Sequence, residues 1–157
     1  MRGFIDTNGG AGLALLGVSQ KPIVMSHYPH MMSEDVTVWS KFLAGITTQI
    51  KEVWYDVHVG RGVLLHVDAD EMLQRIARGV TRKRIDAVCH VGGGYWVVEV
   101  KPVANMYALG QALSYARLFA KEYVVDGEIW PVVVCDQMDD DLLDEFDELG
   151  VGVFVND

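Results

Sequence analysis

Cysteine is scarce in this sequence, and long apolar runs are absent. The chain has two cysteines, Cys89 and Cys135, and both lie in apolar runs that we expect to be buried strands. Two cysteines are too few for a four-cysteine zinc or iron–sulfur site. Buried unpaired thiols are typical of a reducing compartment, so we expect a cytoplasmic protein. No apolar run reaches the roughly 18–20 residues of a membrane span, which predicts no membrane partner.

Basic residues are also in the minority, and the charges are unevenly distributed. Thirteen Lys and Arg residues stand against 22 Asp and Glu, for a formal charge of -9. This balance argues against a long surface that coats DNA without specificity. Residues 136–148 nevertheless hold eight acids and no base, and residues 74–84 hold five bases and no acid.

The two charged segments suggest different partners, although two solvated faces are the alternative. The acidic segment 136–148 is a candidate surface for a protein partner. The basic segment is a candidate contact for the phosphate backbone of a nucleic acid. Its basic residues are Arg75, Arg78, Arg82, Lys83 and Arg84.

The spacing of apolar residues predicts one α/β domain with a mixed sheet flanked by helices. Residues 1–21 are rich in glycine and predict a flexible N-terminal arm, which leaves 22–157 for the domain. The expected helices span 33–45, 70–78, 104–122 and 139–149. The expected strands span 49–59, 63–67, 85–91, 95–100, 128–135 and 151–155, and Pro131 interrupts the fifth of them.

Three glycines at 92–94 join two of these strands, and the hairpin brings charged residues together. Side chains alternate along a strand, so Glu99 and Lys101 share one face. A turn centred on residues 93 and 94 would place Asp86 opposite Lys101. A turn centred on residues 92 and 93 would place Asp86 opposite Glu99. Both registers predict that these three side chains lie close together on one face.

Two carboxylates in an apolar sheet repel each other and lose their hydration. A divalent cation resolves this conflict, and Mg²⁺ is usually held by one or two carboxylates together with water and substrate phosphate. The backbone carbonyl of Val100 is a candidate third ligand. Lys101 would position the attacking water or offset the charge of the phosphate. The alternative is a cross-strand salt bridge of Lys101 with Asp86 or Glu99.

The long helix that follows carries two more candidate residues. Gln111 and Tyr115 lie four residues apart, so they share a face of the helix that is separate from its apolar stripe. We expect both to reach the acidic face of the hairpin, and a half-exposed helix face is the alternative.

Together, these motifs resemble the PD-(D/E)XK nuclease superfamily. The matching segments are "RIDAV" at 84–88, "VVEVK" at 97–101 and "GQALSY" at 110–115. The Gln-x-x-x-Tyr motif resembles the RecB-type branch, which includes phage exonucleases and recombination nucleases. The resemblance covers residues 84–115 well and about two thirds of the chain loosely.

The resemblance implies a restriction-endonuclease-like αβββαβ core and a nuclease that depends on Mg²⁺ or Mn²⁺, with DNA as the expected substrate. It implies Asp86 and Glu99 as metal ligands and Lys101 as the catalytic lysine. Gln111 and Tyr115 would assist catalysis from the helix. A bacterial or phage enzyme fits this reading.

Many members of the superfamily carry a further ligand upstream, and this sequence has no obvious equivalent. Asp56 or His58 is the preferred candidate, and Glu34 and Asp35 are others. The alternative function is a catalytically silent module of the same fold that binds protein or nucleic acid. The sequence leaves open a homo-oligomer, and it does not choose between exonuclease and endonuclease.

Overall fold

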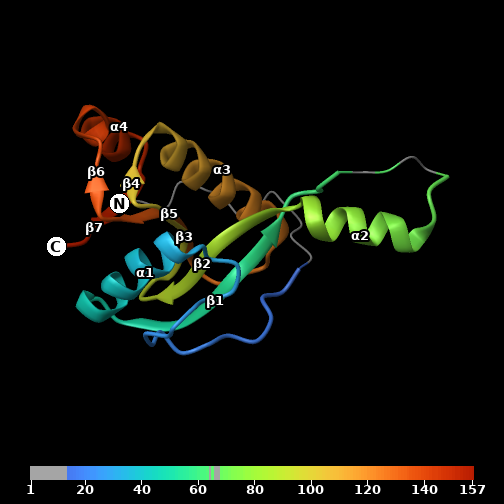
Figure 1. Ribbon diagram of the computed structural model, residues 1–157, viewed down its shortest axis with the longest axis horizontal. Coiled ribbons are helices and arrows are strands. Elements are labelled where there is room, and N and C mark those ends of the chain that lie inside the picture. The colour runs from blue at the N-terminus through green and yellow to red at the C-terminus, as the bar shows by residue number, and fades with distance from the viewer. Residues whose placement is uncertain (1–13, 64, 66–67) are drawn as a thin grey trace.

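The computed structural model describes residues 14–63, 65 and 68–157, and its centre is a mixed five-stranded sheet (Figure 1). The strand order is β1-β2-β3-β5-β7; β1, β2 and β3 are antiparallel, and β5 and β7 run parallel to β3. This arrangement confirms the predicted single α/β domain with a mixed sheet. The strands are β1 (Ile50–Val59), β2 (Lys83–Val91), β3 (Gly94–Val100), β5 (Glu128–Cys135) and β7 (Gly152–Val155).

Two helices cover opposite faces of this sheet (Figure 1). Helix α1 (Ser33–Gly45) buries Trp39 and Phe42 in one cluster, and α3 (Met106–Glu122) buries Phe119 in another. Each large apolar side chain buried in this way contributes roughly 1.5–3 kcal/mol, so the two clusters hold the layers together. The remaining elements are α2 (Glu71–Thr81), α4 (Leu143–Glu148), a 3-10 turn (Asp140–Leu142), and a parallel pair of β4 (Val103–Ala104) and β6 (Gln137–Met138).

Strand β1 changes the face that it buries at Asp56. Tyr55 packs with the cluster beneath α1, whereas Val57, two residues later, packs with the cluster beneath α3. In a regular strand these two side chains would share a face. Asp56 has a φ of 54°, a left-handed conformation in which Asp is enriched. Strand β2 changes face between residues 85 and 87, so Asp86 lies where the sheet bends.

Several predicted boundaries differ from the observed ones. The short strand expected at 63–67 is not formed at residues 63 and 65, and residues 64, 66 and 67 lie outside the described residues. The chain leaves the sheet at Gly60 and Gly62, whose φ values are 82° and 69°. The Val63 N–H then bonds to the hydroxyl of Thr81 on α2 instead of to a strand. Strand β5 runs through Pro131, because the register with β7 begins only at Val132.

The N-terminal arm expected at 1–21 is described only from residue 14. From there the chain is tied to the domain by backbone hydrogen bonds between Gln20 and Val53 (2.7 and 2.9 Å) and between Ala14 and the end of α3. The indole N–H of Trp54 also donates to the Gly17 carbonyl at 2.8 Å. Residues 14–20 therefore pack on the domain instead of extending from it. Among the described residues, no helix is long and apolar enough to cross a membrane.

Candidate active site

The register of the β2–β3 hairpin brings the two predicted acids together. Val91 pairs with Gly94 and Ala87 pairs with Val98, so residues 92 and 93 form the turn. Continued by one residue, this register places Asp86 opposite Glu99. A Cβ at Gly94 would lie 2.0 Å from the Glu128 carbonyl oxygen of β5, so only glycine allows this approach of the neighbouring strand.

Asp86 and Glu99 lie opposite each other on β2 and β3. Glu99 is 2% exposed and is the one buried charged side chain among the described residues, whereas Asp86 is partly exposed. The Val100 N–H donates to Asp86 Oδ2 at 2.8 Å. The two carboxyl groups are close enough for the charge of Asp86 to raise the pKa of Glu99.

Burial controls the ionisation of this pair. Desolvation raises the pKa of Asp86 to about 6, although the Val100 N–H and the charge of Lys101 act in the opposite direction. Burial, followed by the negative charge of Asp86, raises the pKa of Glu99 well above its ordinary value. Burial therefore favours the protonated form of both acids more than it is favoured in exposed carboxyl groups.

Lys101 and Asp35 are the charged neighbours of the pair. The charge of Lys101 lowers the pKa values of both acids, and its backbone N–H donates to the Val134 carbonyl at 3.0 Å, which anchors it beside the end of β3. Asp35, in the first turn of α1, is close enough for its charge to raise the pKa values of both acids. Burial raises the pKa of Asp35 itself.

Asp56 and His58, the preferred upstream ligands, have other contacts. Both carboxylate oxygens of Asp56 accept hydrogen bonds from the Arg84 guanidinium, at 2.7 and 2.8 Å. His58 Nε2 lies 3.6 Å from Asp56 Oδ2. Of the four upstream candidates, Asp35 is therefore the one whose charge is felt by Asp86 and Glu99. Its signal in the sequence is its place in the acidic first turn of α1.

Helix α3 brings Gln111 and Tyr115 to the acids. Burial, followed by the charge of Glu99, raises the pKa of Tyr115, and the neighbouring Gln111 side chain acts in the opposite direction. One side-chain oxygen of Gln111 and one of Glu99 are buried and have no hydrogen-bond partner. Two buried acceptors without donors in one site are unusual, because each such group carries a desolvation cost of about 1–3 kcal/mol.

The donor set fits a cation that keeps most of its water. Asp86 and Glu99 provide two carboxylates. The Val100 carbonyl points to the same strand edge as its N–H, which bonds to Asp86. Among the described residues, no group of three or more His, Cys, Asp and Glu is placed to hold a metal. Mg²⁺ suits such a site, because it binds through one or two carboxylates and takes its remaining ligands from water and phosphate.

The basic residues predicted to bind nucleic acid fall into two groups. Arg82 donates to the carbonyls of Gly60 (2.8 Å) and His58 (3.1 Å) and forms an ion pair with Glu122, while Arg84 is paired with Asp56. Arg82 thus ties the β1–β2 ribbon to α3, and Arg84 ties β2 to β1 within the ribbon, roles that the sequence did not reveal. Arg75, Arg78 and Lys83 are exposed.

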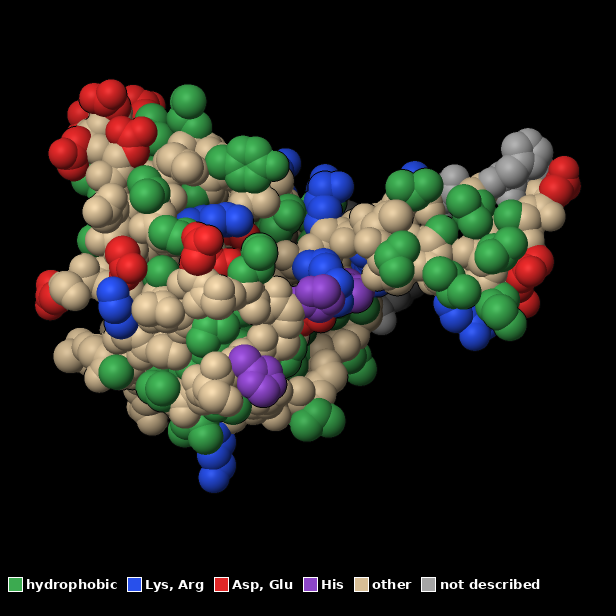
Figure 2. Space-filling model, in the orientation of Figure 1, with side chains coloured by type: hydrophobic (Ala, Val, Ile, Leu, Met, Phe, Trp, Pro, Cys, Tyr) green, Lys and Arg blue, Asp and Glu red, His purple; other side chains and the backbone are tan. Residues whose placement is uncertain are grey.

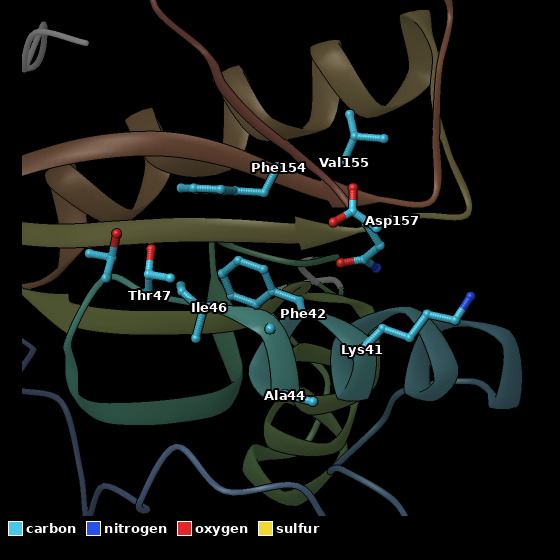
Figure 3. Close-up of a pocket in the computed structure, with 11 residues that line it drawn as sticks. Lys41, Phe42, Ala44, Ile46, Thr47, Phe154, Val155 and Asp157 are labelled. Carbon is cyan, nitrogen blue, oxygen red and sulfur yellow. The ribbon is translucent and has the colours of Figure 1, made fainter.

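A separate hollow of about 490 Å³ lies between the end of α1 and β7 (Figure 3). Figure 3 shows Phe42 and Phe154 among the residues that line it; their ring centroids are 5.3 Å apart, so the two rings pack against each other. Lys41 pairs with Asp136 at 3.4 Å. The hollow contains neither Asp86 nor Glu99, so the acidic pair remains the better candidate for catalysis.

No family model matches the chain, and neither a curated protein nor a solved structure matches it.

Proposed function

We propose that this protein is a metal-dependent nuclease that hydrolyses phosphodiester bonds of DNA. The observation that supports this most strongly is that Asp86 lies opposite the buried Glu99, near Lys101, and that one carboxyl oxygen of Glu99 has no hydrogen-bond donor. An ion pair or acid pair in a core adds little stability and is often replaced by neutral groups at no loss. A cation that binds in place of a proton accounts for both carboxylates.

The order of the elements supports the finer assignment to the restriction-endonuclease-like αβββαβ core of the PD-(D/E)XK nucleases. Helix α1 is followed by three antiparallel strands, then by α3 and a strand parallel to β3. In this assignment α2, between β1 and β2, is an addition to the core.

The side chains of the site take the following roles in the proposal. A bound Mg²⁺ or Mn²⁺ supplies Lewis-acid stabilisation of the phosphate and a lower pKa for an attacking water. Asp86, Glu99 and the Val100 carbonyl would hold the cation. Any proton on the two carboxyl groups would be released when the cation binds. The Lys101 ammonium group orients the water or offsets the developing charge of the phosphate. Gln111 and Tyr115 border the Glu99 side of the site and limit the access of solvent.

Cleavage assays test the assignment directly. Linear, circular and single-stranded DNA are incubated with Mn²⁺ or with EDTA, and wild type is compared with Glu99→Gln, Lys101→Met and the matched control Lys121→Met. Lys121 is exposed at the other end of α3. We expect metal-dependent cleavage that falls at least roughly 100-fold in the two site variants and persists in the control. Full activity in both site variants, with unchanged circular dichroism, would overturn the assignment.

A catalytically silent module is the second candidate, and it is favoured because the described residues contain no group of three or more His, Cys, Asp and Glu placed to hold a metal. Calorimetric titration with millimolar Mn²⁺ separates the two functions. Binding that is lost in Glu99→Gln supports the nuclease. Wild-type protein that binds no Mn²⁺ and cleaves no DNA supports the module.

A further inference from the structure

Helix α2 lies on an arm that extends away from the domain (Figure 1). Strand β3 pairs only with residues 87–91 of β2, so β1 and the first residues of β2 continue alone as a two-stranded ribbon. The ribbon carries α2, which contributes no buried residue to the core. The packing of the core therefore does not depend on α2. The surface of α2 is a candidate binding surface.

A hollow of about 490 Å³ lies between α2 and the base of the ribbon. Figure 2 shows Lys or Arg side chains and His side chains gathered at the narrow waist between the body of the molecule and the arm. Arg75, Arg78 and Arg82 line the hollow together with His58, Gln74 and Glu71. Every residue that lines it lies within the described part of the chain.

The orientation of α2 is the reverse of that of an ordinary surface helix. Its apolar residues Met72, Ile76 and Val80 are 68%, 54% and 71% exposed, whereas its arginines line the hollow that faces the domain. An amphipathic helix normally turns its apolar stripe towards the protein. A hollow that takes up a polyanion explains why the basic side of α2 faces inward.

Cationic groups in the hollow are open to a ligand. Arg75 pairs with Glu71 at 3.7 Å, but both side chains are largely exposed, so the pair is weak. The Arg78 guanidinium forms no ion pair within the described residues. Arg82 is held by Glu122 and by backbone carbonyls, which fixes one wall of the hollow.

The hollow and the acidic pair lie along the same strand. Four residues of extended chain separate Arg82 from Asp86, which corresponds to roughly 13 Å. A stacked nucleic-acid strand presents a phosphate about every 3.4 Å along its axis, and an extended strand presents phosphates at wider spacing, so this length spans about two to four nucleotides. One strand can therefore contact both places at once.

We propose that the hollow under α2 binds the phosphate backbone of a single nucleic-acid strand, about two to four nucleotides from the bond at Asp86 and Glu99. Its catalytic consequence rests on the proposed nuclease function. The hollow has the volume of a small-ligand site, about 300–1,000 Å³, which suits one or two nucleotides and not the width of a duplex. The proposal thus names single-stranded DNA, or the unpaired end of a duplex, as the substrate class.

Binding without metal tests the hollow apart from catalysis. The affinity of a fluorescein-labelled single strand of roughly 12 nucleotides is measured in EDTA by anisotropy over a range of salt concentrations. Wild type is compared with Arg75→Ala/Arg78→Ala and with Arg117→Ala/Lys121→Ala, which removes the same charge from exposed positions on α3. The α2 variant is expected to bind about tenfold more weakly, with a salt slope lower by roughly 1.4, and the control to bind like wild type.

A second pair of variants tests the charge of the hollow without unfolding α2. Gly79 lines the hollow, and a Cβ there meets nothing within 4 Å. Gly79→Glu and Gly79→Gln both favour the helix over glycine, and they differ only in charge. Gly79→Glu is expected to weaken binding severalfold through repulsion of the phosphate, and Gly79→Gln to leave it unchanged.

The outcomes separate this proposal from the nuclease assignment. Equal losses of strand affinity in the α2 variant and the α3 control would overturn the proposal that the hollow binds a single strand. Tighter binding of a duplex of the same length would also overturn it. Unchanged cleavage by the α2 variant, together with unchanged affinity for the single strand, would also overturn the proposal. Strand binding that depends on α2, without cleavage by wild type in Mn²⁺, would support the hollow and count against the nuclease.

Discussion

The buried acid pair should lower the stability of the metal-free protein at high pH, and Glu99→Gln should restore it. In the native state both acids have raised pKa values, and burial is the largest cause for each. Glutamine has the same shape as protonated glutamic acid and cannot ionise. The substitution therefore removes an ionisation that burial opposes and keeps the volume of the side chain.

The effect of the substitution follows from Glu99, because Asp86 keeps its burial and its raised pKa of about 6 in both proteins. Burial raises the pKa of Glu99 well above its ordinary value, so the native state keeps a proton that the unfolded state releases once the pH exceeds that ordinary value. The stability of wild type relative to Glu99→Gln therefore falls as pH rises above the ordinary range of a glutamate and levels off only above the native pKa. Each pH unit in this range corresponds to about 1.4 kcal/mol as an upper limit.

Urea and thermal unfolding in EDTA at pH 5 and pH 8 measure the effect. We expect Glu99→Gln to be more stable than wild type by about 1–3 kcal/mol at pH 8, or roughly 2–10 °C in Tm, and equal to it near pH 5. Millimolar Mn²⁺ should then stabilise wild type and not the variant. A variant that is less stable at pH 8, or one whose difference from wild type is the same at both pH values, would refute the reasoning.

Three further changes test the surroundings of the site. Asp56→Asn keeps a residue that tolerates positive φ and weakens the contact with Arg84. It should lower the free energy of unfolding in urea by about 1–2 kcal/mol and leave DNA cleavage intact. Loss of Mn²⁺ affinity in this variant would instead make Asp56 a metal ligand. Phe119→Ala should cost about 3–5 kcal/mol in urea unfolding, because the side chain is fully buried beneath α3, and a loss under 1 kcal/mol would contradict this packing. Asn105→Ala should cost about 1 kcal/mol in the same assay, since the Asn105 side chain caps α3 by accepting from the Ala108 N–H at 3.0 Å, and an unchanged midpoint would show that the cap contributes nothing.

Local patterns in the sequence predicted most of the elements. Apolar residues two apart indicated the strands, and those three or four apart indicated the helices, because these periods are properties of the chain itself. The glycines at 92–94 predicted the hairpin for the same reason. The pattern failed at Val63 and Leu65, which form no strand.

Local patterns did not predict which ion-pair partners the arginines have. Arg82 pairs with Glu122, 40 residues away, and Arg84 pairs with Asp56, 28 residues away. Both arginines looked like free cations in a basic segment. Their engagement depends on how β1, β2 and α3 are brought together, which no local spacing expresses.

The sequence by itself determined which groups meet at the site. Alternation places Asp86, Glu99 and Lys101 on one face in either hairpin register, and helical spacing places Gln111 with Tyr115. Only the tertiary structure decided the register, through the approach of β5 to Gly94, and showed that Asp35 is the upstream acid whose charge reaches the pair. The physical reason is that periodicity is a local property, whereas burial, raised pKa values and ion-pair partners depend on segments that become neighbours only when the chain folds.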